Sequence, residues 1–213
     1  MIKHVIWDLD GTLFETIPAI TNSILASLAD QGFHPKPEMV RELAKISASH
    51  CIAILAETYR ISATEIIEGF NHHYGKIPYF EQPLKPGALD LCSFIHHSLS
   101  GLNLVITHRE RQSTSELFEY HGLSPLISDL ITGDQGYPKK PDPTSMLAII
   151  DRNRLQGFDI LAIGDRKIDV LTGQAAGART CILGHSDSSI QPDFEVESLY
   201  EVLEMIQLQI IES

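Results

Sequence analysis

Short apolar runs that end at polar residues are the main pattern of this chain. Such runs are too short for helices and rich in β-branched residues, so they predict buried strands. They occupy residues 4–7, 102–107, 126–132, 160–164 and 179–183. Later in the chain, apolar residues at helical spacing between these runs predict helices at 114–121, 143–150, 168–176 and 196–211. Strands that alternate with helices predict an α/β fold with a doubly wound parallel sheet.

A helical block interrupts this alternation after the first strand. Apolar residues keep a helical spacing over residues 17–31 and 38–74, with prolines on either side of the second stretch. We therefore expect a small inserted α-helical domain at residues 15–85. The core domain would then consist of residues 1–14 and 86–213.

Composition and charge narrow the classes of function. The 213 residues carry a formal net charge of −12, which argues against nucleic acid as a partner. No apolar run approaches the ~20 residues that span a bilayer, and the first residues lack the longer apolar stretch of a signal peptide. The three cysteines form no CxxC pair. We expect a cytoplasmic protein without membrane association.

The basic residues of this acidic chain gather directly after predicted strands. They are Arg109, Arg111, Lys139, Lys140, Arg166 and Lys167. Parallel sheets of this kind bind ligands beyond the carboxyl ends of their strands. Convergence of these ends would give one basic pocket, which suits an anionic ligand.

Four clusters at predicted strand ends carry candidate chemistry. They are Asp8-Leu9-Asp10-Gly11-Thr12, Thr107-His108-Arg109, Lys139-Lys140-Pro141, and Gly164-Asp165 together with Asp169. Carboxylates, a hydroxyl and an ammonium group in one crevice form a coherent site for phosphoryl transfer.

The first cluster is the most informative. In an extended segment, residues two apart project to the same side, so Asp8 and Asp10 can face one ligand. Two close carboxylates repel unless a cation lies between them or one binds a proton. Mg²⁺ takes oxygen ligands and phosphate together, one carboxylate can attack phosphorus, and the other can pass protons. The alternative is a solvated turn with two acids.

The other clusters are ambiguous when taken singly. Asp165 can be a helix N-cap, although Asp169 would share its helical face, and metal binding would explain two acids there. Thr107 can be an ordinary strand-end residue. Lys139 and Lys140 can be solvated loop charges.

Taken in order along the chain, the clusters resemble the four motifs of haloacid dehalogenase superfamily phosphatases. The matching segments are Asp8-Leu9-Asp10-Gly11-Thr12-Leu13, Thr107, Lys140-Pro141-Asp142-Pro143, and Gly164-Asp165 with Asp169. The helical insert lies where the phosphoglycolate phosphatase and β-phosphoglucomutase-like subfamily carries a helical C1-type cap. The resemblance implies a Rossmann-like core with this cap. It also implies hydrolysis of a small phosphorylated metabolite: phosphoglycolate, a sugar phosphate or a nucleotide.

The resemblance also implies a metal site and two acid roles. Asp8 would attack phosphorus to give an aspartyl phosphate and would ligate Mg²⁺. Asp10 would protonate the leaving oxygen, activate the hydrolytic water, and ligate the metal through its backbone carbonyl. Asp165 would complete the metal site, and Asp169 would support the metal ligands without binding the ion itself.

The remaining motif residues would hold the phosphate group beside Asp8. Thr107 and Lys140 would bind phosphate oxygens, and Lys140 would also offset the charge of Asp8. His108 and Arg109 stand where relatives frequently have Asn, which adds basic character near the phosphate. Glu15, at the junction with the cap, stands where many relatives have Asp.

Three residues bear on the alternatives within the superfamily. Asp10 argues against dehalogenases and phosphonatases, which lack an acid at this position. Lys45 is therefore expected to be a solvated helix lysine and not a cap lysine that forms a Schiff base. Phosphomutases resemble the chain closely but use a His on the first cap helix. The aligned residue here is Ile20, which favours a hydrolase.

The expected cap offers one candidate for substrate selection. A helical insert can shield an aspartyl phosphate from water, so the substrate must fit beneath it. Ser47, Ser49 and His50 form a polar interruption between two amphipathic helices, and His50 could contact the non-phosphate end of the substrate. Alternatively, the segment is only a helix junction with Ser49 as the cap.

A different class of protein shares much of this chemistry. Signalling receiver domains combine a doubly wound sheet, an acidic pair, a Thr and a Lys around an aspartyl phosphate. They are shorter, and their phosphorylated Asp lies between the acidic pair and the Thr. Here an α-helical insert lies between Asp10 and Thr107 instead.

Overall fold

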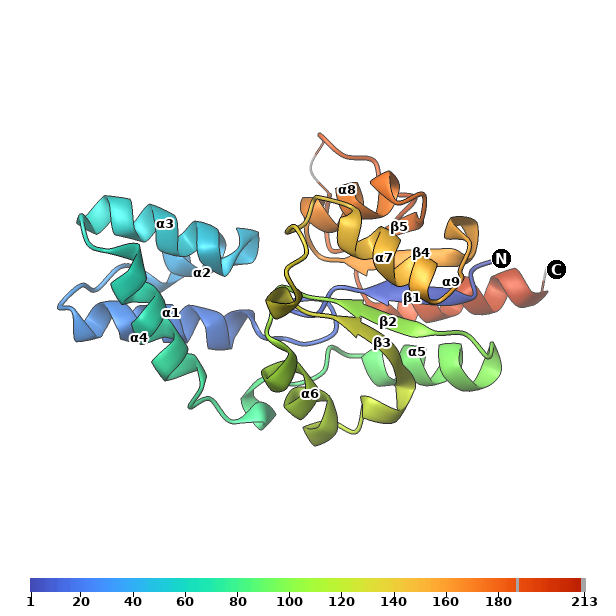
Figure 1. The fold of residues 1–213 in the computed structure, drawn as a ribbon, viewed down its shortest axis with the longest axis horizontal. Helices are drawn as coiled ribbons and strands as arrows, with labels where there is room; N and C mark the ends of the chain where they lie inside the picture. Colours follow the sequence, from blue (N-terminus) through green and yellow to red (C-terminus); the bar gives the residue numbers. More distant parts are fainter. Residues whose placement is uncertain (187, 212–213) are drawn as a thin grey trace. The chain divides into compact units, whose positions relative to one another are not determined.

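The computed structural model describes residues 1–186 and 188–211, which divide into two compact units (Figure 1). One unit consists of Met1–Phe14 and the chain from Leu84 onward, and the other is Glu15–Pro83. No helix in the described ranges is long and apolar enough to cross a membrane.

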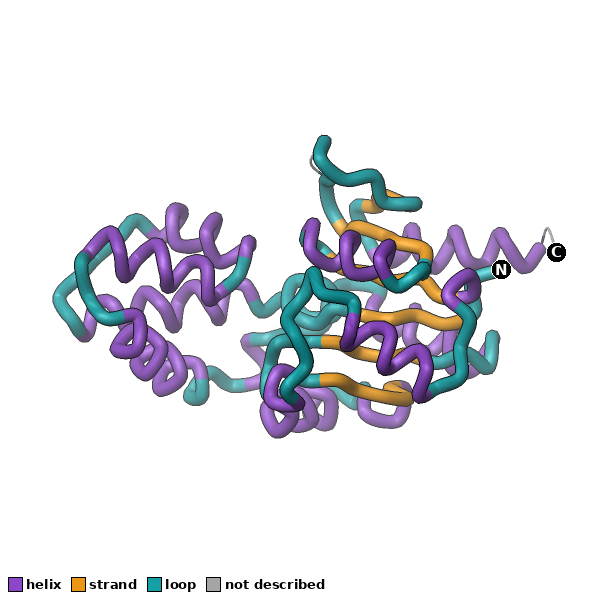
Figure 2. The backbone as a smooth tube through the Cα atoms, turned by 45° about the horizontal axis from the view of Figure 1, so that its top comes forward, coloured by secondary structure: helices purple, strands orange, loops and turns teal. Residues whose placement is uncertain are grey.

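The first unit is built on a parallel sheet whose strands lie side by side in Figure 2. Within the described ranges the sheet has six strands in the order β3-β2-β1-β4-β5-β6. Their bounds are β1 His4–Trp7, β2 Asn103–Ile106, β3 Ile127–Ile131, β4 Ile160–Gly164, β5 Arg179–Leu183 and β6 Phe194–Val196. The predicted doubly wound parallel sheet is therefore confirmed. Strand β6 was not predicted, because three residues carry too little periodicity.

The strand order places a switch point between β1 and β4. From β1 the chain winds outward to β2 and β3, and it then returns to add β4, β5 and β6 on the other side. Receiver domains have a different order, 2-1-3-4-5, so the sheet argues against that class. Trp7 lies opposite Val105 and Ile163, so neighbouring strands end level with one another. Polar residues that directly follow these strands therefore share one edge.

Helices cover both faces of this sheet. Their bounds are α5 Ala88–Ser93, α6 Arg111–Tyr120, α7 Thr144–Arg152, α8 Lys167–Ala175 and α9 Leu199–Ile211. Met146 of α7 packs in one apolar cluster with Leu104 of β2. The preceding side chain, Asn103, points to the opposite face, where it donates to the Cys92 carbonyl of α5. Burial on both faces explains why β2 and β4 are apolar runs without alternation.

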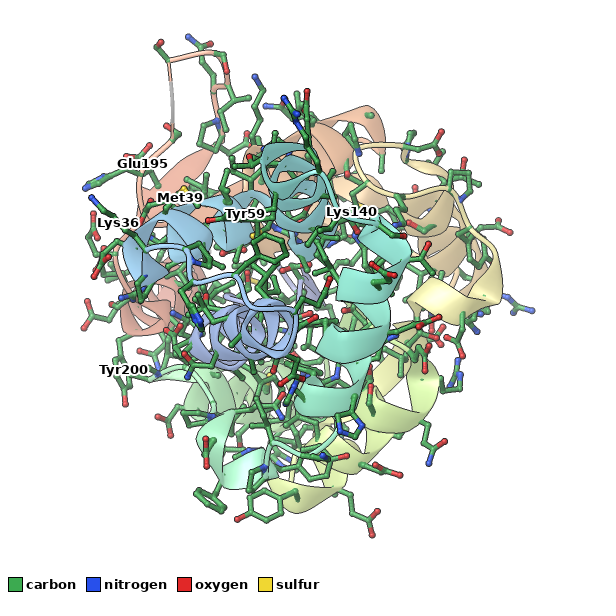
Figure 3. All side chains as sticks on the ribbon, turned by 90° about the vertical axis from the view of Figure 1, so that its left-hand side faces the viewer. Lys36, Met39, Tyr59, Lys140, Glu195 and Tyr200 are labelled. Carbon is green, nitrogen blue, oxygen red and sulfur yellow. The ribbon has the colours of Figure 1, made fainter. Side chains whose placement is uncertain are left out.

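The second unit is helical and has its own core. It contains α1 Ile17–Asp30, α2 Pro37–Ile46, α3 Ala48–Tyr59 and α4 Ala63–Tyr74. Fully buried apolar side chains from all four helices meet there, among them Leu28, Val40, Leu55 and Ile66. Among the side chains labelled in Figure 3, Tyr59 packs against this core, whereas Lys36 and Met39 are exposed.

The junction between α2 and α3 corrects one detail of the sequence analysis. Ser47 is the N-cap of α3, and its side chain accepts a hydrogen bond from the backbone N–H of His50 at 3.0 Å. Ser49 lies within the first turn of the helix, so Ser49 as the cap is wrong. Both serines can start a helix, but only the residue with extended backbone does so here, and Ser47 has φ −175° and ψ 154°.

Candidate active site

The loop after β1 delivers two acids to the carboxyl edge of the sheet. The backbone N–H of Asp8 still donates to Ile163 of β4, so the first acid is fixed as if it continued the strand. Gly11 then turns the chain with φ +89°, and a Cβ there would collide with the Asp165 carboxylate. Glycine at this position therefore allows the first and fourth motifs to approach closely.

Asp8 is buried and paired with a buried lysine. Lys140 Nζ lies 2.6 Å from Asp8 Oδ1 and 2.7 Å from Asp169 Oδ1, and all three side chains are at most 6% exposed. The Lys140–Pro141 peptide bond is cis. The neighbouring Lys139 is exposed. The structure thus brings the first, third and fourth motifs together through Lys140.

Arg166 adds a second basic group that was not predicted as a site residue. Its Nη2 donates to Asp8 Oδ1 at 3.2 Å. Its Nε lies 3.7 Å from Asp165 Oδ1 and 3.5 Å from Asp169 Oδ2. The sequence marked it only as one of several basic residues after strands, because its contacts depend on how the fold returns β4 beside β1.

Three carboxylates form a group that could hold a metal ion. One oxygen from each of Asp8, Asp165 and Asp169 lies within 4.8 Å of the others. Thr12 Oγ1 lies 3.5 Å from Asp8 Oδ2 and 3.3 Å from Asp165 Oδ1, so its hydroxyl bridges two of them. Gly164 is needed beside this group, because a Cβ there would collide with the Asp169 carboxylate. Thr12 was part of the first motif, but no contact had been assigned to it.

The electrostatic surroundings shift the pKa values of Asp8 and Asp165 in opposite directions. Burial alone would raise the pKa of Asp8, but the charges of Lys140 and Arg166 outweigh it and hold that pKa below its ordinary value. Burial, followed by repulsion from Asp8, raises the pKa of Asp165 to about 7. Asp8 is therefore an ionised carboxylate. For Asp165, the Arg166 guanidinium at 3.7 Å does not outweigh burial and the charge of Asp8.

The second motif lies on the neighbouring strand end. Thr107 is buried, and its Oγ1 accepts a hydrogen bond from the backbone N–H of Arg109 at 3.1 Å. Arg109 Nη1 lies 3.8 Å from Asp10 Oδ1, and the Arg109 side chain is 7% exposed. The predicted basic character next to Thr107 is thus directed at the second acid of the first motif.

His108 supports the lysine loop. Its Nε2 accepts a hydrogen bond from the backbone N–H of Lys140 at 3.2 Å, which requires a neutral ring that carries its proton on Nδ1. Loss of hydration where the ring meets the protein, followed by the charges of Lys140 and Arg166, lowers the pKa of His108 to about 4. His108 therefore contributes a neutral ring rather than a positive charge at neutral pH.

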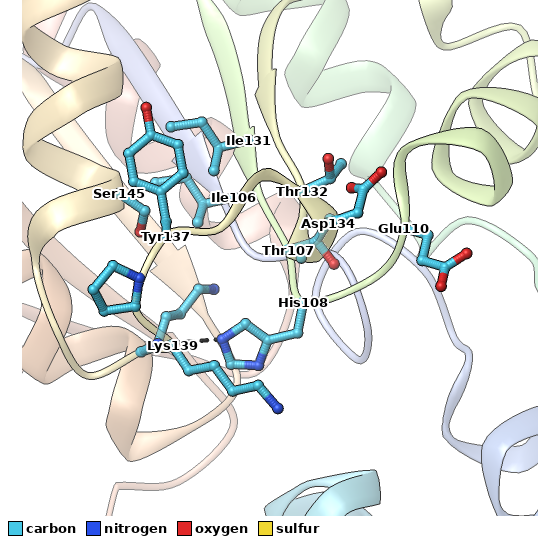
Figure 4. A pocket seen from close by; sticks show the side chains of 13 residues that line it. Ile106, Thr107, His108, Glu110, Ile131, Thr132, Asp134, Tyr137, Lys139 and Ser145 are labelled. Atoms are coloured by element: carbon cyan, nitrogen blue, oxygen red, sulfur yellow. Dashed lines mark hydrogen bonds between the residues drawn. The ribbon is translucent and has the colours of Figure 1, made fainter. Parts of the chain in front are cut away.

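A cavity of about 260 Å³ adjoins this motif (Figure 4). It is formed by the segments that follow β2 and β3, and its lining includes Thr107, His108, Tyr137, Lys139 and Lys140. Lys140 thus borders both the carboxylate group and this cavity, and Thr107 borders the cavity.

The predicted cap residues lie in the other unit. Ser47, Ser49 and His50 occur at the start of α3. Lys45 is exposed and pairs with Glu42 at 2.7 Å, as expected for a solvated helix lysine. Ile20 is 8% exposed and packs in the apolar core of that unit.

Comparisons with known proteins agree with this architecture. Residues 5–183 match the model of a family described as haloacid dehalogenase-like hydrolase. A phosphoglycolate phosphatase of Rhodospirillum rubrum is 31% identical over 88% of this chain and 82% of its own length. A phosphoglycolate phosphatase of Aliivibrio fischeri is 30% identical over 96% and 97%.

Solved structures share the fold at lower identity. A predicted phosphoglycolate phosphatase from Haemophilus somnus has a TM-score of 0.82 and 18% identity over 96% of this chain and 98% of its own. A Thermotoga maritima protein provisionally assigned as a β-phosphoglucomutase has a TM-score of 0.77 and 19% identity over 97% and 99%. These likenesses extend to both units of the fold.

Proposed function

The chain belongs to the haloacid dehalogenase-like hydrolase family, and we propose that it hydrolyses a small phosphorylated metabolite through an aspartyl phosphate on Asp8. Within the family it is a phosphatase, like the relatives it matches. One observation carries the proposal: a buried, ionised carboxylate stands at a strand end between Lys140 and Arg166. Such a group can attack phosphorus while the basic residues hold the phosphate oxygens.

The donor set fits a magnesium ion. Mg²⁺ binds oxygen ligands, and three carboxylates gather here with oxygens within 4.8 Å of one another. We assign Asp8, Asp165 and the backbone carbonyl of Asp10 as ligands. Asp169 accepts a hydrogen bond from Lys140 and supports the ligands without binding the ion itself. When bound, the ion would neutralise phosphate charge and orient the group for attack.

The protein's own residues account for the proton transfers. Asp8 bonds to phosphorus as the ester oxygen leaves, and Asp10 gives that oxygen its proton. Water then attacks the phosphorus of the aspartyl phosphate and returns a proton to Asp10, which releases inorganic phosphate and frees Asp8. Thr107 and Lys140 hold phosphate oxygens, with His108 as a further donor through Nδ1.

Among the candidate substrates we favour phosphoglycolate, because curated relatives at about 30% identity carry that name. Sugar phosphates and nucleotides are the alternatives. Ile20 supports hydrolysis over phosphate transfer between hydroxyls, since an isoleucine in an apolar core cannot pass a proton. We further propose that the unit Glu15–Pro83 is the cap, and that Ser47, Ser49 and His50 read the non-phosphate end of the substrate.

The test is a phosphate-release assay on phosphoglycolate, sugar phosphates and nucleotides. We expect activity to vanish in chelator, to return with Mg²⁺, and to return poorly with Ca²⁺, whose larger and looser shell would misplace the nucleophile. Rapid acid quenching should trap phosphate on Asp8. Full activity after exhaustive chelation would remove the metal from the mechanism, and phosphate trapped elsewhere would remove Asp8.

A further inference from the structure

Arg166 places a permanent positive charge among the carboxylates of the proposed metal site. Its guanidinium donates to Asp8 and lies within 3.7 Å of oxygens of Asp165 and Asp169. We propose that Arg166 is a positioning residue that acts as a built-in counter-cation: it holds these carboxylates together without metal and lowers their affinity for Mg²⁺. The inference rests on the metal site of the proposed function.

The carboxylates need more positive charge than Lys140 supplies. Lys140 pairs with Asp8 and Asp169, and Arg166 additionally reaches Asp165. Buried carboxylates this close repel strongly, because little water lies between them to screen their charges. The guanidinium is itself mostly buried, with 17% of the side chain exposed, so its charge acts on the group at nearly full strength.

The backbone fixes Arg166 in this place. The residue precedes the first turn of α8, and its backbone N–H donates to Asp169 Oδ2 at 3.2 Å. The side-chain Nε is buried and makes no hydrogen bond within the described part of the chain. Charge attraction to Asp165 and Asp169, and not a hydrogen bond, therefore holds Nε in place. Another cation can provide the same attraction to these carboxylates.

An entering Mg²⁺ meets this charge. Either Arg166 gives up its contacts or two positive charges share the site, and both alternatives weaken binding. Charges of +2 and +1 about 5 Å apart change a binding constant roughly tenfold even in water, and more strongly where water is excluded. Salt screens such a buried pair only weakly.

The next residue provides a matched control. Lys167 also carries one positive charge at the start of α8, but it is exposed and its Nζ contacts Ser189 Oγ at 2.6 Å. Arg166→Met and Lys167→Met therefore remove the same charge one residue apart, and only the first removes it from the carboxylates. Arg166→Lys keeps the charge on a different head group.

Calorimetric titration with Mg²⁺ and thermal unfolding in chelator test the proposal without an activity assay. We expect Arg166→Met to bind Mg²⁺ about tenfold more tightly or better. Its melting temperature in chelator should fall, and its rise on adding Mg²⁺ should exceed that of the wild type. Arg166→Lys and Lys167→Met should stay close to the wild type, and raised salt should preserve the difference. If Arg166→Met does not fold in chelator, Arg166→Gln takes its place.

The outcomes separate this inference from the proposed function. Binding by Arg166→Met that is equal to or weaker than wild-type binding would overturn the role of Arg166 and leave the metal site intact. An equal gain in affinity for Lys167→Met would show a general charge effect and would also overturn it. Absence of Mg²⁺ binding in every protein would overturn the metal site, and this inference with it.

Discussion

At the scale of single residues, Asp8 and Asp10 show how the fold can give two acids different tasks. Asp8 is 3% exposed and ionised between Lys140 and Arg166. Asp10 is more open, with 23% of its side chain exposed and Arg109 at 3.8 Å. A nucleophile needs a fixed, charged oxygen, whereas an acid–base group must exchange protons with substrate and water.

Substitution by Asn should separate these two tasks. Asp8→Asn removes the nucleophile and a metal ligand, so turnover should stop. Asp10→Asn keeps the backbone carbonyl but cannot carry a proton, so turnover should fall by about 10²–10⁴-fold while Mg²⁺ binding persists. Initial rates and calorimetric Mg²⁺ titrations check both variants. Turnover of Asp10→Asn at the wild-type rate would show that the roles are assigned wrongly.

His108 gives a prediction for the dependence of stability on pH. Its pKa is lowered from 6.5 to about 4 in the folded protein, so between these values the unfolded chain binds a proton that the folded protein does not. The contribution of His108 to the free energy of unfolding is thus full above about pH 6.5 and is lost as the pH falls toward 4.

The matched variant is His108→Gln, which can still accept the Lys140 N–H but does not titrate. Both proteins should have similar melting temperatures at pH 7.5 in chelator. When the pH is lowered to 4.5, the melting temperature of the wild type should fall by more than that of the variant. The fall that remains in the variant reports the other titrating groups. Parallel losses in the two proteins would contradict a neutral acceptor with a lowered pKa at His108.

Most of the residues gathered at the site could be named from the sequence, and the exceptions have a physical reason. Asp8, Lys140 and Asp169 belong to short motifs whose residue types already indicate phosphoryl chemistry. Arg166 and Thr12 act through contacts across the sheet, at sequence separations above 150 residues. Contacts of that range depend on strand order, which local patterns do not encode.

At the scale of elements, periodicity located strands well and helix ends less well. Strands β4 and β5 begin and end at the predicted residues. For β4 the reason is clear, because a run that is buried throughout stops at Asp165. Helix α7 begins at Thr144, one residue after the predicted start at Pro143, although Asp142 Oδ1 still accepts from the Thr144 backbone N–H at 2.9 Å. Helix α5 was not located, since its six residues complete fewer than two turns.

Asn103 joins several elements inside the apolar core. Its Oδ1 accepts from Trp7 Nε1 of β1 at 3.1 Å, and its Nδ2 donates to the carbonyls of Cys92 and Leu126 at 2.9 and 3.1 Å. The side chain is fully buried, so water cannot replace these bonds. A polar residue in a buried strand thus links β1, α5 and the turn before β3.

Asn103→Ala should therefore be costly. It removes the Asn103 partner of one buried donor and two carbonyl acceptors, and we expect the free energy of unfolding to fall by about 2–4 kcal/mol. Chemical denaturation in the presence of Mg²⁺ measures the change. Asn71→Ala, at an exposed position of α4, is the control and should change stability by less than about 0.5 kcal/mol. A similar small effect at Asn103 would mean that the network is not needed for stability.

At the scale of the whole molecule, charge is distributed so that basic residues of an acidic protein gather around the carboxylates of the site. The net charge is −12, yet Arg109, Lys140 and Arg166 all lie within 4 Å of motif carboxylates. The sequence placed six basic residues near strand ends, but not all of them reach the motif carboxylates. Arg111, for instance, donates to the Leu130 carbonyl. A position directly after a strand brings a residue to the carboxyl edge of the sheet. The direction of its side chain then decides whether it reaches the site.

If the helical unit is the cap, as we propose, chemistry and selectivity can be altered independently. The site residues all belong to the sheet-containing unit, whereas Glu15–Pro83 has its own core and contains the residues proposed to read the substrate. Within that unit, Ser47 is occupied as the cap of α3. His50 follows in the exposed first turn, which leaves its imidazole as the group best suited to recognition.

His50→Ala should then change the order in which substrates are preferred and leave the hydrolysis of a small generic aryl phosphate nearly unchanged. The imidazole can donate a hydrogen bond or, when protonated, offer a charge to a carboxylate or hydroxyl at the non-phosphate end, and a generic ester has no such group to lose. Values of kcat/KM over a panel of phosphoglycolate, sugar phosphates and nucleotides measure this. His34→Ala removes an exposed imidazole elsewhere in the same unit and should keep the wild-type order. If His50→Ala also keeps that order, His50 does not read the substrate, and selection must come from other residues.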